Sequence, residues 1–253
     1  MPLSAPVITL LTDFGTADGY VGEMKGVLLA GAPGAQLVDL THDVPPQDVE
    51  SGRLVVARCW RRFPPDTVHL VVVDPGVGSE RRALAVASDG RLLVGPDNGI
   101  LSPALLLAGA RAISLSIPSS ASATFHGRDV FAPAAAALAT GTPLEALGPP
   151  VDDPVVRRTP EAHRRDDGAI LGEIITIDRF GNAVTNLVGR LGGVLEVGGR
   201  ALRVCRTYAD VNVGEPAALV GSTGLIEVAV REGSAAQTFA LRRGSAVVLK
   251  PRA

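Results

Sequence analysis

One turn of the chain has an aspartate before it and two arginines after it, residue types that can form a functional site. Asp74 directly follows three valines, residues 71–73, and a turn of proline and glycines separates it from Arg81 and Arg82. Consecutive β-branched residues are typical of a buried strand, and proline and glycine end such a strand. Asp74 is therefore predicted at the strand-end edge where α/β sheets bind ligands. Taken alone, the stretch also fits a loop cap in which Asp74 pairs with Arg81 or Arg82.

Other polar loops share this pattern. The segments 13–19, 41–48, 74–82 and 95–99 follow candidate strands, and 124–129 precedes a helix. Together they predict a polar cleft. Asp13, His42, Asp74 and His126 are potential metal ligands, but they have no recognisable ligand spacing, so we expect no metal site. The chain has no GxGxxG, P-loop, GxSxG or HExxH motif.

The elements that must position these loops alternate between strand and helix. Apolar runs at 7–12, 35–40 and 68–73 predict strands, and residues 20–30 and 48–63 have helical spacing with Asp48 as a cap. In the second of these helices we expect Val49, Leu54, Val55 and Trp60 to face inward. Further along we expect a hairpin around residues 89–90, helices at 101–107 and 130–140, and a strand at 111–117. This order predicts an N-terminal α/β domain, residues 1–155, with a mostly parallel sheet and flanking helices.

The apolar residues of the second half of the chain are spaced differently from those of the first half. Residues 156–167 belong to a polar, proline-bearing stretch that suits a linker. From residue 168 to 253, short apolar runs alternate with glycine-rich turns, which predicts a smaller, all-β, barrel-like domain.

Composition excludes several classes of partner. The 253 residues are 46% hydrophobic and carry a formal charge of −2, so no basic field points to nucleic acid or to a membrane. No apolar run approaches 18 residues, and Cys59 and Cys205 have no partner motif. We interpret both as buried thiols and expect a cytoplasmic protein.

Several of these segments together resemble one known family. In chain order, the sequence resembles the S-adenosyl-L-methionine hydroxide adenosyltransferases, relatives of the fluorinase and chlorinase enzymes, at Leu11-Thr12-Asp13-Phe14-Gly15, Val73-Asp74-Pro75-Gly76-Val77-Gly78-Ser79-Glu80-Arg81, Pro96-Asp97-Asn98-Gly99, Phe125-His126-Gly127-Arg128-Asp129 and Asp178-Arg179-Phe180-Gly181-Asn182.

The resemblance implies a reaction and an assembly. Members cleave S-adenosylmethionine at ribose C5′ with water or hydroxide, giving adenosine and L-methionine, without a further cofactor. It also implies a homotrimer, in which each active site lies between the N-terminal domain of one subunit and the C-terminal domain of the next.

The family's Asp-Arg-His set falls on Asp74, Arg81 and His126. We expect Arg81 to keep Asp74 ionised, and Asp74 and His126 to hold and deprotonate the water, with His126 as the better proton acceptor. A structural role for His126 remains an alternative. Arg82 is expected to be solvated or to make an interface contact.

The resemblance also implies substrate-binding residues. Asp13 corresponds to the acid that accepts both ribose hydroxyls, with a turn cap as its alternative. It implies that Asp178 and Ser222, assisted by Asp18, bind the methionine end of the substrate. It also implies that the side-chain amide of Asn182 binds adenine. Phe125 either packs against adenine or fills the core, and the segment at Glu232 and Gly233 offers backbone groups near adenine. At Tyr20 a halogenating relative has a smaller hydroxyl residue, so the resemblance implies no methionine contact for Tyr20.

Two rival functions remain at this point. One is a halide-dependent adenosyl transfer on the same scaffold, which a carboxylate at position 74 disfavours because it repels a halide. The other is a non-catalytic sensor of S-adenosylmethionine or adenosine.

Overall fold

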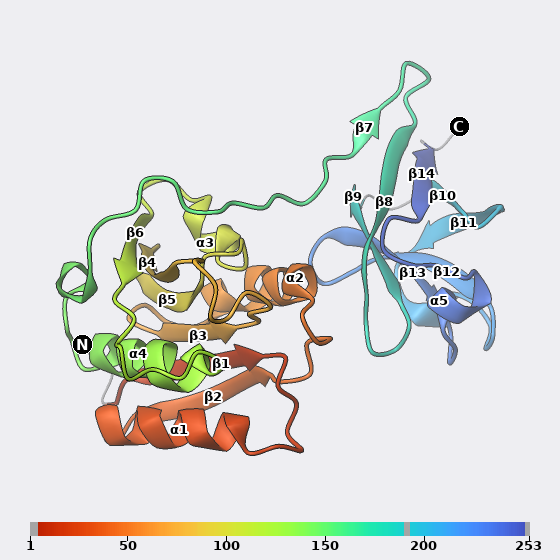
Figure 1. The fold of residues 1–253 in the computed structure, drawn as a ribbon. Coiled ribbons are helices and arrows are strands. Elements are labelled where there is room, and N and C mark those ends of the chain that lie inside the picture. The colour runs from red at the N-terminus through yellow and green to blue at the C-terminus, as the bar shows by residue number, and fades with distance from the viewer. Residues whose placement is uncertain (1–4, 190–192, 251–253) are drawn as a thin grey trace. The chain divides into compact units, whose positions relative to one another are not determined.

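A computed structural model describes residues 5–189 and 193–250 (Figure 1). It divides into two units, residues 1–158 and 159–253. The change of unit falls inside the segment predicted as a linker.

The N-terminal unit contains a six-stranded sheet with the order β2-β1-β3-β5-β4-β6. Strands β2, β1, β3 and β5 are mutually parallel, and β4 runs antiparallel to both β5 and β6. The strands are β1 (Val7–Thr12), β2 (Gln36–Thr41), β3 (Val68–Val72), β4 (Ala83–Ser88), β5 (Arg91–Pro96) and β6 (Arg111–Leu115).

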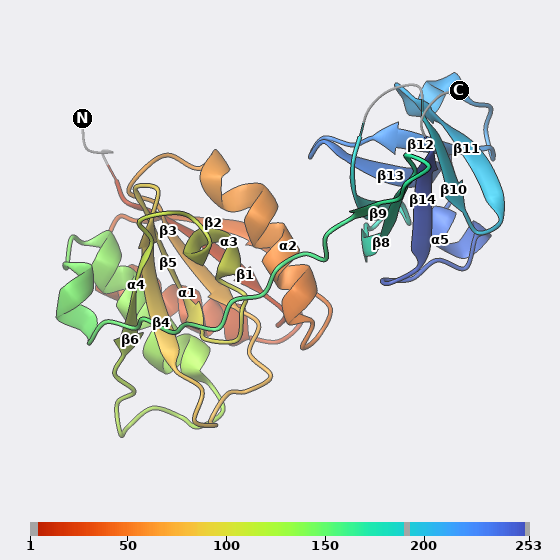
Figure 2. The same ribbon diagram turned by 90° about the horizontal axis from the view of Figure 1, so that it is seen from above.

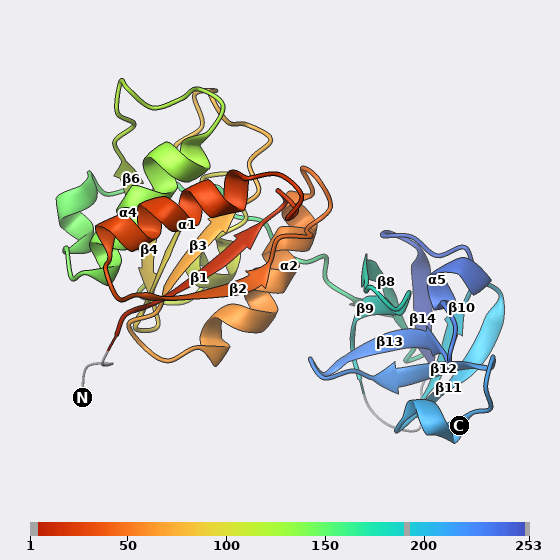
Figure 3. The ribbon, with the colours of Figure 1, turned by 90° about the horizontal axis from the view of Figure 1, so that it is seen from below.

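Helices cover both faces of this sheet. The helices α1 (Tyr20–Gly31) and α4 (Ala132–Ala139) lie side by side on one face (Figure 3). Their core contains Met24, Leu28 and Ala135 against the β1 and β3 side chains Ile8 and Leu70. The opposite face is covered by α2 (Val49–Cys59) and α3 (Ser102–Leu105) (Figure 2). The short helices η1 (Trp60–Arg62), η2 (Gly127–Phe131) and η3 (Leu144–Leu147) complete the unit.

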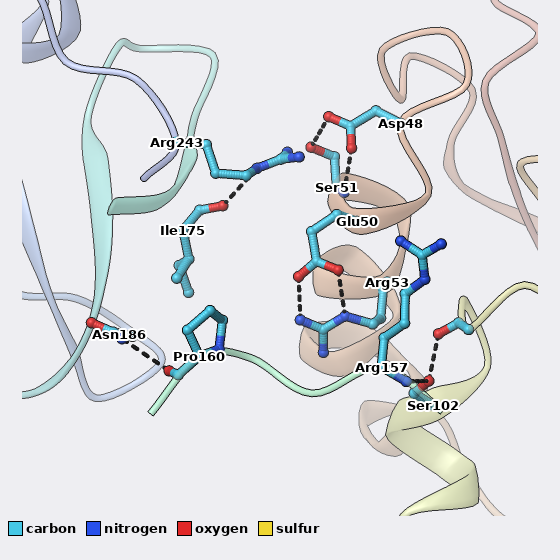
Figure 4. Close-up of polar contacts among 11 residues, drawn as sticks. Asp48, Glu50, Ser51, Arg53, Ser102, Arg157, Pro160, Ile175, Asn186 and Arg243 are labelled. Atoms are coloured by element: carbon cyan, nitrogen blue, oxygen red, sulfur yellow. Dashed lines mark hydrogen bonds and ion pairs between the residues drawn. The ribbon is translucent and has the colours of Figure 1, made fainter. Parts of the chain in front are cut away.

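The predicted cap of α2 is confirmed, whereas one predicted core position is wrong. Asp48 accepts a hydrogen bond from the Ser51 backbone N–H at 3.0 Å, which satisfies an orphan donor of the first turn (Figure 4). The helix buries Val49 and Val56, but not Leu54, which we expected to point inward. The helical turn places Val56, four residues before Trp60, on the core side instead.

The C-terminal unit is a β-barrel, as the period of the sequence predicts. Its strands follow the order β14-β10-β11-β12-β13-β9-β8, and pairing of β14 with β8 closes the ring (Figure 1). The elements are β7 (His163–Arg164), β8 (Ile170–Ile177), β9 (Ala183–Val188), β10 (Val194–Val197), β11 (Arg200–Cys205), η4 (Tyr208–Asp210), β12 (Pro216–Val220), β13 (Leu225–Val230), α5 (Ala235–Thr238) and β14 (Ala246–Lys250). Inward-facing side chains such as Leu195, Val204 and Ile226 fill the barrel.

The two cysteines are free thiols. Cys205 is buried, whereas Cys59 is only partly buried, so the expectation of two buried thiols holds for one of them. Helix α2 ends at Cys59, one residue before the buried Trp60. Within the described residues, no helix has the length and apolar character needed to cross a membrane.

A buried histidine makes this fold sensitive to acid. His69 on β3 is fully buried, and its Nδ1 lies 2.7 Å from the hydroxyl of Thr9 on β1. Burial, and secondarily the charge of Arg91, lowers the pKa of His69 from 6.5 to about 4. His69 therefore becomes protonated near pH 6.5 in the unfolded chain, but only near pH 4 in the folded chain. The corresponding stability is complete above pH 6.5 and is lost as the pH falls toward 4.

We predict that the free energy of unfolding falls by about 2 kcal/mol between pH 7 and pH 5 through His69 alone. Urea denaturation at both values measures it. The fall should be smaller in His69→Leu, whatever its stability at pH 7, and unchanged in His163→Leu, whose histidine is exposed. An identical fall in His69→Leu and the wild type would contradict the assignment.

Candidate active site

The centre of the candidate site is one arginine that joins two predicted catalytic residues. Arg81 donates from Nε to Asp74 Oδ1 at 2.9 Å, and from Nη2 to Asp74 Oδ2. The same Nη2 lies 2.8 Å from His126 Nδ1. The side chains of Arg81 and Asp74 are 10% and 5% exposed, and His126 is buried. The structure thus brings together Asp74, Arg81 and His126.

The guanidinium decides the tautomer of His126. An arginine nitrogen can only donate, so Nδ1 must accept with its lone pair, and the proton of the neutral ring is on Nε2. Burial, followed by the positive charge of Arg81, lowers the pKa of His126, while Asp74 and Asp129 act in the opposite direction. A neutral His126 with an occupied Nδ1 is poorly placed to accept a proton, which weighs against the role we expected for it.

Two loops must meet to make this contact, and Gly78 allows them to. The Asp74 loop begins after β3. It contains a turn in which the Ser79 backbone N–H donates a hydrogen bond to the Gly76 carbonyl oxygen at 3.1 Å. Gly78 has φ +77°, and a Cβ there would lie 2.4 Å from the carbonyl oxygen of Ala123. Only glycine fits both conditions, so the loop can lie directly against the 121–126 segment.

A turn of π-helix follows His126. The element η2 has π-type hydrogen bonding, which is rare and often accompanies functional sites. Its Phe131 ring lies under the Arg81 guanidinium, 5.2 Å from Cζ to the ring centroid. Asp129 accepts hydrogen bonds from Arg128 and, at 2.8 Å, from the Ser122 backbone N–H, and these contacts lower the pKa of Asp129. This loop is therefore held before and after His126.

The other N-terminal residues that we expected at the site lie after β1. Asp13 is partly buried and accepts a 2.7 Å hydrogen bond from the Gln47 backbone N–H on Oδ2. Asp18 is exposed. β1 is also where the chain order of the sheet reverses, since β2 lies on one side of it and β3 on the other. Asp13 and Asp74 therefore follow adjacent strands at the switch point, where open α/β sheets bind ligands.

Phe125 lies within an aromatic cluster. The residue is 8% exposed, and its ring contacts the rings of Phe14 and Tyr20 edge-on, with centroids 5.8 and 5.3 Å away. The Arg128 guanidinium covers it at 5.0 Å. Of the two roles the sequence allows, this enclosure fits core packing better than contact with an adenine. Tyr20 is 48% exposed, so it forms the outer side of the cluster.

For Arg82 we expected a solvated side chain or an interface contact; the side chain is 34% exposed and forms ion pairs inside the N-terminal unit. Its Nε donates to Asp97 at 2.7 Å, and its Nη1 donates to Asp153 at 2.6 Å. The Asp97 side chain is 2% exposed, and a buried carboxylate requires a cation close by. These two ion pairs raise the pKa of Arg82.

The C-terminal unit gathers most of its predicted site residues at one end of the barrel. In the β8–β9 turn, Asp178 Oδ1 accepts the backbone N–H of Phe180 and of Asn182 at 2.9 Å, and Oδ2 accepts the Asn182 side-chain amide at 2.9 Å. The Ala236 N–H donates to the Gly181 carbonyl at 2.9 Å, which joins this turn to the segment that carries Glu232 and Gly233.

Ser222 is not part of that group. It is exposed in the β12–β13 turn, whereas Gly233 follows the other end of β13. β9 pairs antiparallel with β13, with Val188 opposite Leu225 and Ala183 opposite Val228. Within this unit, Ser222 is therefore separated from Asp178 by the length of β13, about 17 Å at a rise of about 3.4 Å per residue.

Potential metal ligands are scattered in the described parts of the chain. Among residues 5–189 and 193–250, no three His, Cys, Asp or Glu side chains gather in a way that could hold a metal ion. His42 accordingly has a local role, with Nδ1 2.8 Å from the Thr12 hydroxyl and Nε2 3.0 Å from Asp39.

We predict that Gly78→Ala destabilises the N-terminal unit far more than Gly109→Ala. Gly109 has almost the same backbone angle, φ +79°, but no atom within 4 Å of an added Cβ. Its substitution should cost about 1 kcal/mol through backbone strain, and Gly78→Ala a further 1–3 kcal/mol, roughly, through the clash with Ala123. Urea denaturation measures both, and equal costs would contradict the close approach.

Comparison with known proteins agrees with the five sequence segments. Residues 8–148 match the model of the SAM hydroxide adenosyltransferase N-terminal domain, and residues 172–248 match that of its C-terminal domain. A Thermus thermophilus protein named (R)-S-adenosyl-L-methionine hydrolase is 45% identical, with 96% of this chain and 98% of that protein aligned.

More distant comparisons extend the relationship. The crystal structure of an uncharacterized conserved protein from Thermotoga maritima superimposes with a TM-score of 0.89 at 32% identity, covering 96% of this chain and all of that one. A fluorinase from Actinoplanes is 28% identical over 96% of this chain and 97% of its own. The chain therefore belongs to the SAM hydroxide adenosyltransferase family.

Proposed function

We propose that this protein hydrolyses S-adenosyl-L-methionine to adenosine and L-methionine. The observation that carries the proposal is the Arg81 guanidinium, which holds the carboxylate of Asp74 and the ring of His126 at one nearly buried point. The name of the Thermus relative, (R)-S-adenosyl-L-methionine hydrolase, supports the same reaction. That name specifies the (R) form at sulfur, so we propose (R)-S-adenosyl-L-methionine as the substrate.

The chemistry requires little beyond a positioned water. The oxygen of water forms a bond to C5′ of the ribose while the bond from C5′ to sulfur breaks, and the sulfonium leaves as the neutral thioether of methionine. Because the sulfonium is already a good leaving group, the proposed reaction needs neither a general acid nor a cofactor. The protein must align the water opposite sulfur and receive its proton.

Asp74 is the proposed acceptor of that proton. Each carboxylate oxygen can accept two hydrogen bonds, and Arg81 occupies one on each oxygen. A water could bind to the remaining positions. The Nε2–H of neutral His126 is a donor and can orient the oxygen of the water. We assign Arg81 to fixing the other two groups, and this assignment replaces proton acceptance by His126.

Binding of the substrate is proposed to involve five of the other predicted residues. Asp13 retains Oδ1 for a ribose hydroxyl, since its bond to Gln47 uses Oδ2. Asp178 and Asn182, with backbone groups at Glu232 and Gly233, are candidates for the amino-acid and adenine ends. We also propose, from the family resemblance, that the protein is cytoplasmic and forms a homotrimer whose subunits share active sites. Light scattering in solution tests the number of subunits.

We predict that the protein converts (R)-S-adenosyl-L-methionine to adenosine and L-methionine, and that chloride or fluoride does not change the products. Asp74→Asn keeps the shape but loses the base, so its kcat should fall by about 10²- to 10⁴-fold. Chromatography of the products measures both. A 5′-halo nucleoside in place of adenosine would support the halide alternative, and tight binding without turnover would support a sensor.

The acid limit of the activity should lie below the ordinary histidine pKa. Protonation of His126 at Nδ1 would break its bond to Arg81, so only the neutral ring supports the proposed geometry. Since burial and Arg81 lower the pKa of His126 from 6.5, the midpoint of the acid-side decline in kcat/KM should lie below pH 6.5. In His126→Asn this decline should disappear. A midpoint at or above 6.5 in the wild type would contradict the model.

A further inference from the structure

Two consecutive residues hold both ends of the loop that carries Asp74 and Arg81. The side-chain amide of Asn98 donates to the carbonyl oxygen of Val73 at 2.9 Å, where the loop begins. The backbone N–H of Asp97 donates to the carbonyl oxygen of Arg82 at 3.0 Å, where the loop ends. We refer to Asp97 and Asn98, which follow β5, as the clamp.

The side chain of Asp97 strengthens the grip on the end of the loop. Its Oδ2 accepts from Arg82 Nε at 2.7 Å, and its Oδ1 accepts the Val155 backbone N–H at 2.7 Å. With the side chain 2% exposed, both oxygens are used in a nearly dry environment, where charge-assisted bonds are strong. Asn98 is similarly fixed, because its Oδ1 accepts the Ile100 N–H at 3.1 Å.

The last residues of the N-terminal unit lock the clamp from outside. Arg82 Nη2 donates to the carbonyl oxygen of Asp153 at 2.7 Å, and the Arg157 N–H donates to the Ser102 hydroxyl at 2.8 Å (Figure 4). The Arg157 side chain lies so close over Gly99 that a Cβ there would be 2.4 Å from its Cγ. The loop after β5 is thus enclosed between the Asp74 loop and the 153–157 segment.

The clamp bears directly on the geometry of the site. Arg81 and Arg82 are adjacent in sequence but bind different partners. Arg81 contacts Asp74 and His126 in the candidate site, whereas Arg82 contacts Asp97 in the clamp. Arg81 can meet both carboxylate oxygens of Asp74 only if the two ends of their loop keep a fixed separation. The bond from Asn98 to Val73 and those from Asp97 to Arg82 set that separation at its base.

We propose that Asp97 and Asn98 are positioning residues for the reaction, which hold Asp74 and Arg81 in register without contacting the substrate. This inference rests on the hydrolysis proposed above. Displacement of a reacting group by about 1 Å can cost about 10²-fold in rate. The clamp should therefore act on kcat and leave the binding of S-adenosylmethionine nearly unchanged.

The test compares Asn98→Ala and Asp97→Asn with the control Asp152→Ala. Asp97→Asn keeps the shape but turns an amide toward Arg82, and Asn98→Ala removes the donor to Val73. Asp152 is exposed and adjacent to Asp153, so its substitution removes the same charge without touching the clamp. Both clamp variants should lose at least about tenfold in kcat with KM within about threefold of the wild type, and Asp152→Ala should lose nothing.

A second measurement separates positioning from stability. If Arg81 shifts away from His126, the acid limit of kcat/KM should move to higher pH in both clamp variants, which a loss of stability in a folded enzyme would not cause. Circular dichroism identifies a temperature at which all variants are folded. A kcat within twofold of the wild type, a change confined to KM, or an unmoved acid limit in the folded variants would overturn the proposal. A wild type that forms no adenosine would instead overturn the proposed hydrolysis.

Discussion

The bidentate bond between Arg81 and Asp74 is the interaction on which the candidate site depends. A guanidinium stays protonated at any pH a protein experiences, so its bonds to Asp74 and His126 have only one possible direction. That single fact places two donors on the carboxylate oxygens of Asp74 and selects the Nε2–H form of the imidazole of His126. Loss of Arg81 would leave a carboxylate that is 5% exposed without a counter-ion, a change that typically costs about 3–5 kcal/mol.

Several local devices bring this arginine to its partners. Gly78 allows the Asp74 loop to touch the 121–126 segment, the π-helical turn presents Phe131 to the guanidinium, and Asp97 and Asn98 hold the ends of the loop. None of these devices is close to another in sequence. The parallel sheet makes them neighbours, because β3 and β5 are adjacent strands and their following loops emerge at the same edge.

Much of the fold could be predicted because its strands are contiguous apolar runs with clear stops. The runs at 7–12 and 68–73 became β1 and β3 almost residue for residue, and the glycine-rich second half became a barrel. The inward face of α2 was harder, because Leu54 and Val56 are both apolar and only packing against the sheet decides between them.

The details of the site depended on contacts that no local pattern encodes. The contact of Arg81 with His126 spans 45 residues and became predictable only through the family resemblance. The tautomer of His126 and the partner of Arg82 could not be foreseen, since each depends on which side chain lies opposite after folding. The family resemblance assigned Ser222 and Asp178 to the same end of the substrate, whereas the antiparallel pairing of β9 with β13 puts them near opposite ends of β13.

The closure of the barrel has a consequence for how the chain is made. β14 pairs with β10 and β8, so both strands keep an unpaired edge until residues 246–250 have left the ribosome. Unpaired edges are templates for aggregation. The N-terminal unit, whose sheet is complete by residue 115, can fold much earlier during synthesis. Translation that stops shortly before β14 would therefore release a folded α/β unit attached to an open, aggregation-prone sheet.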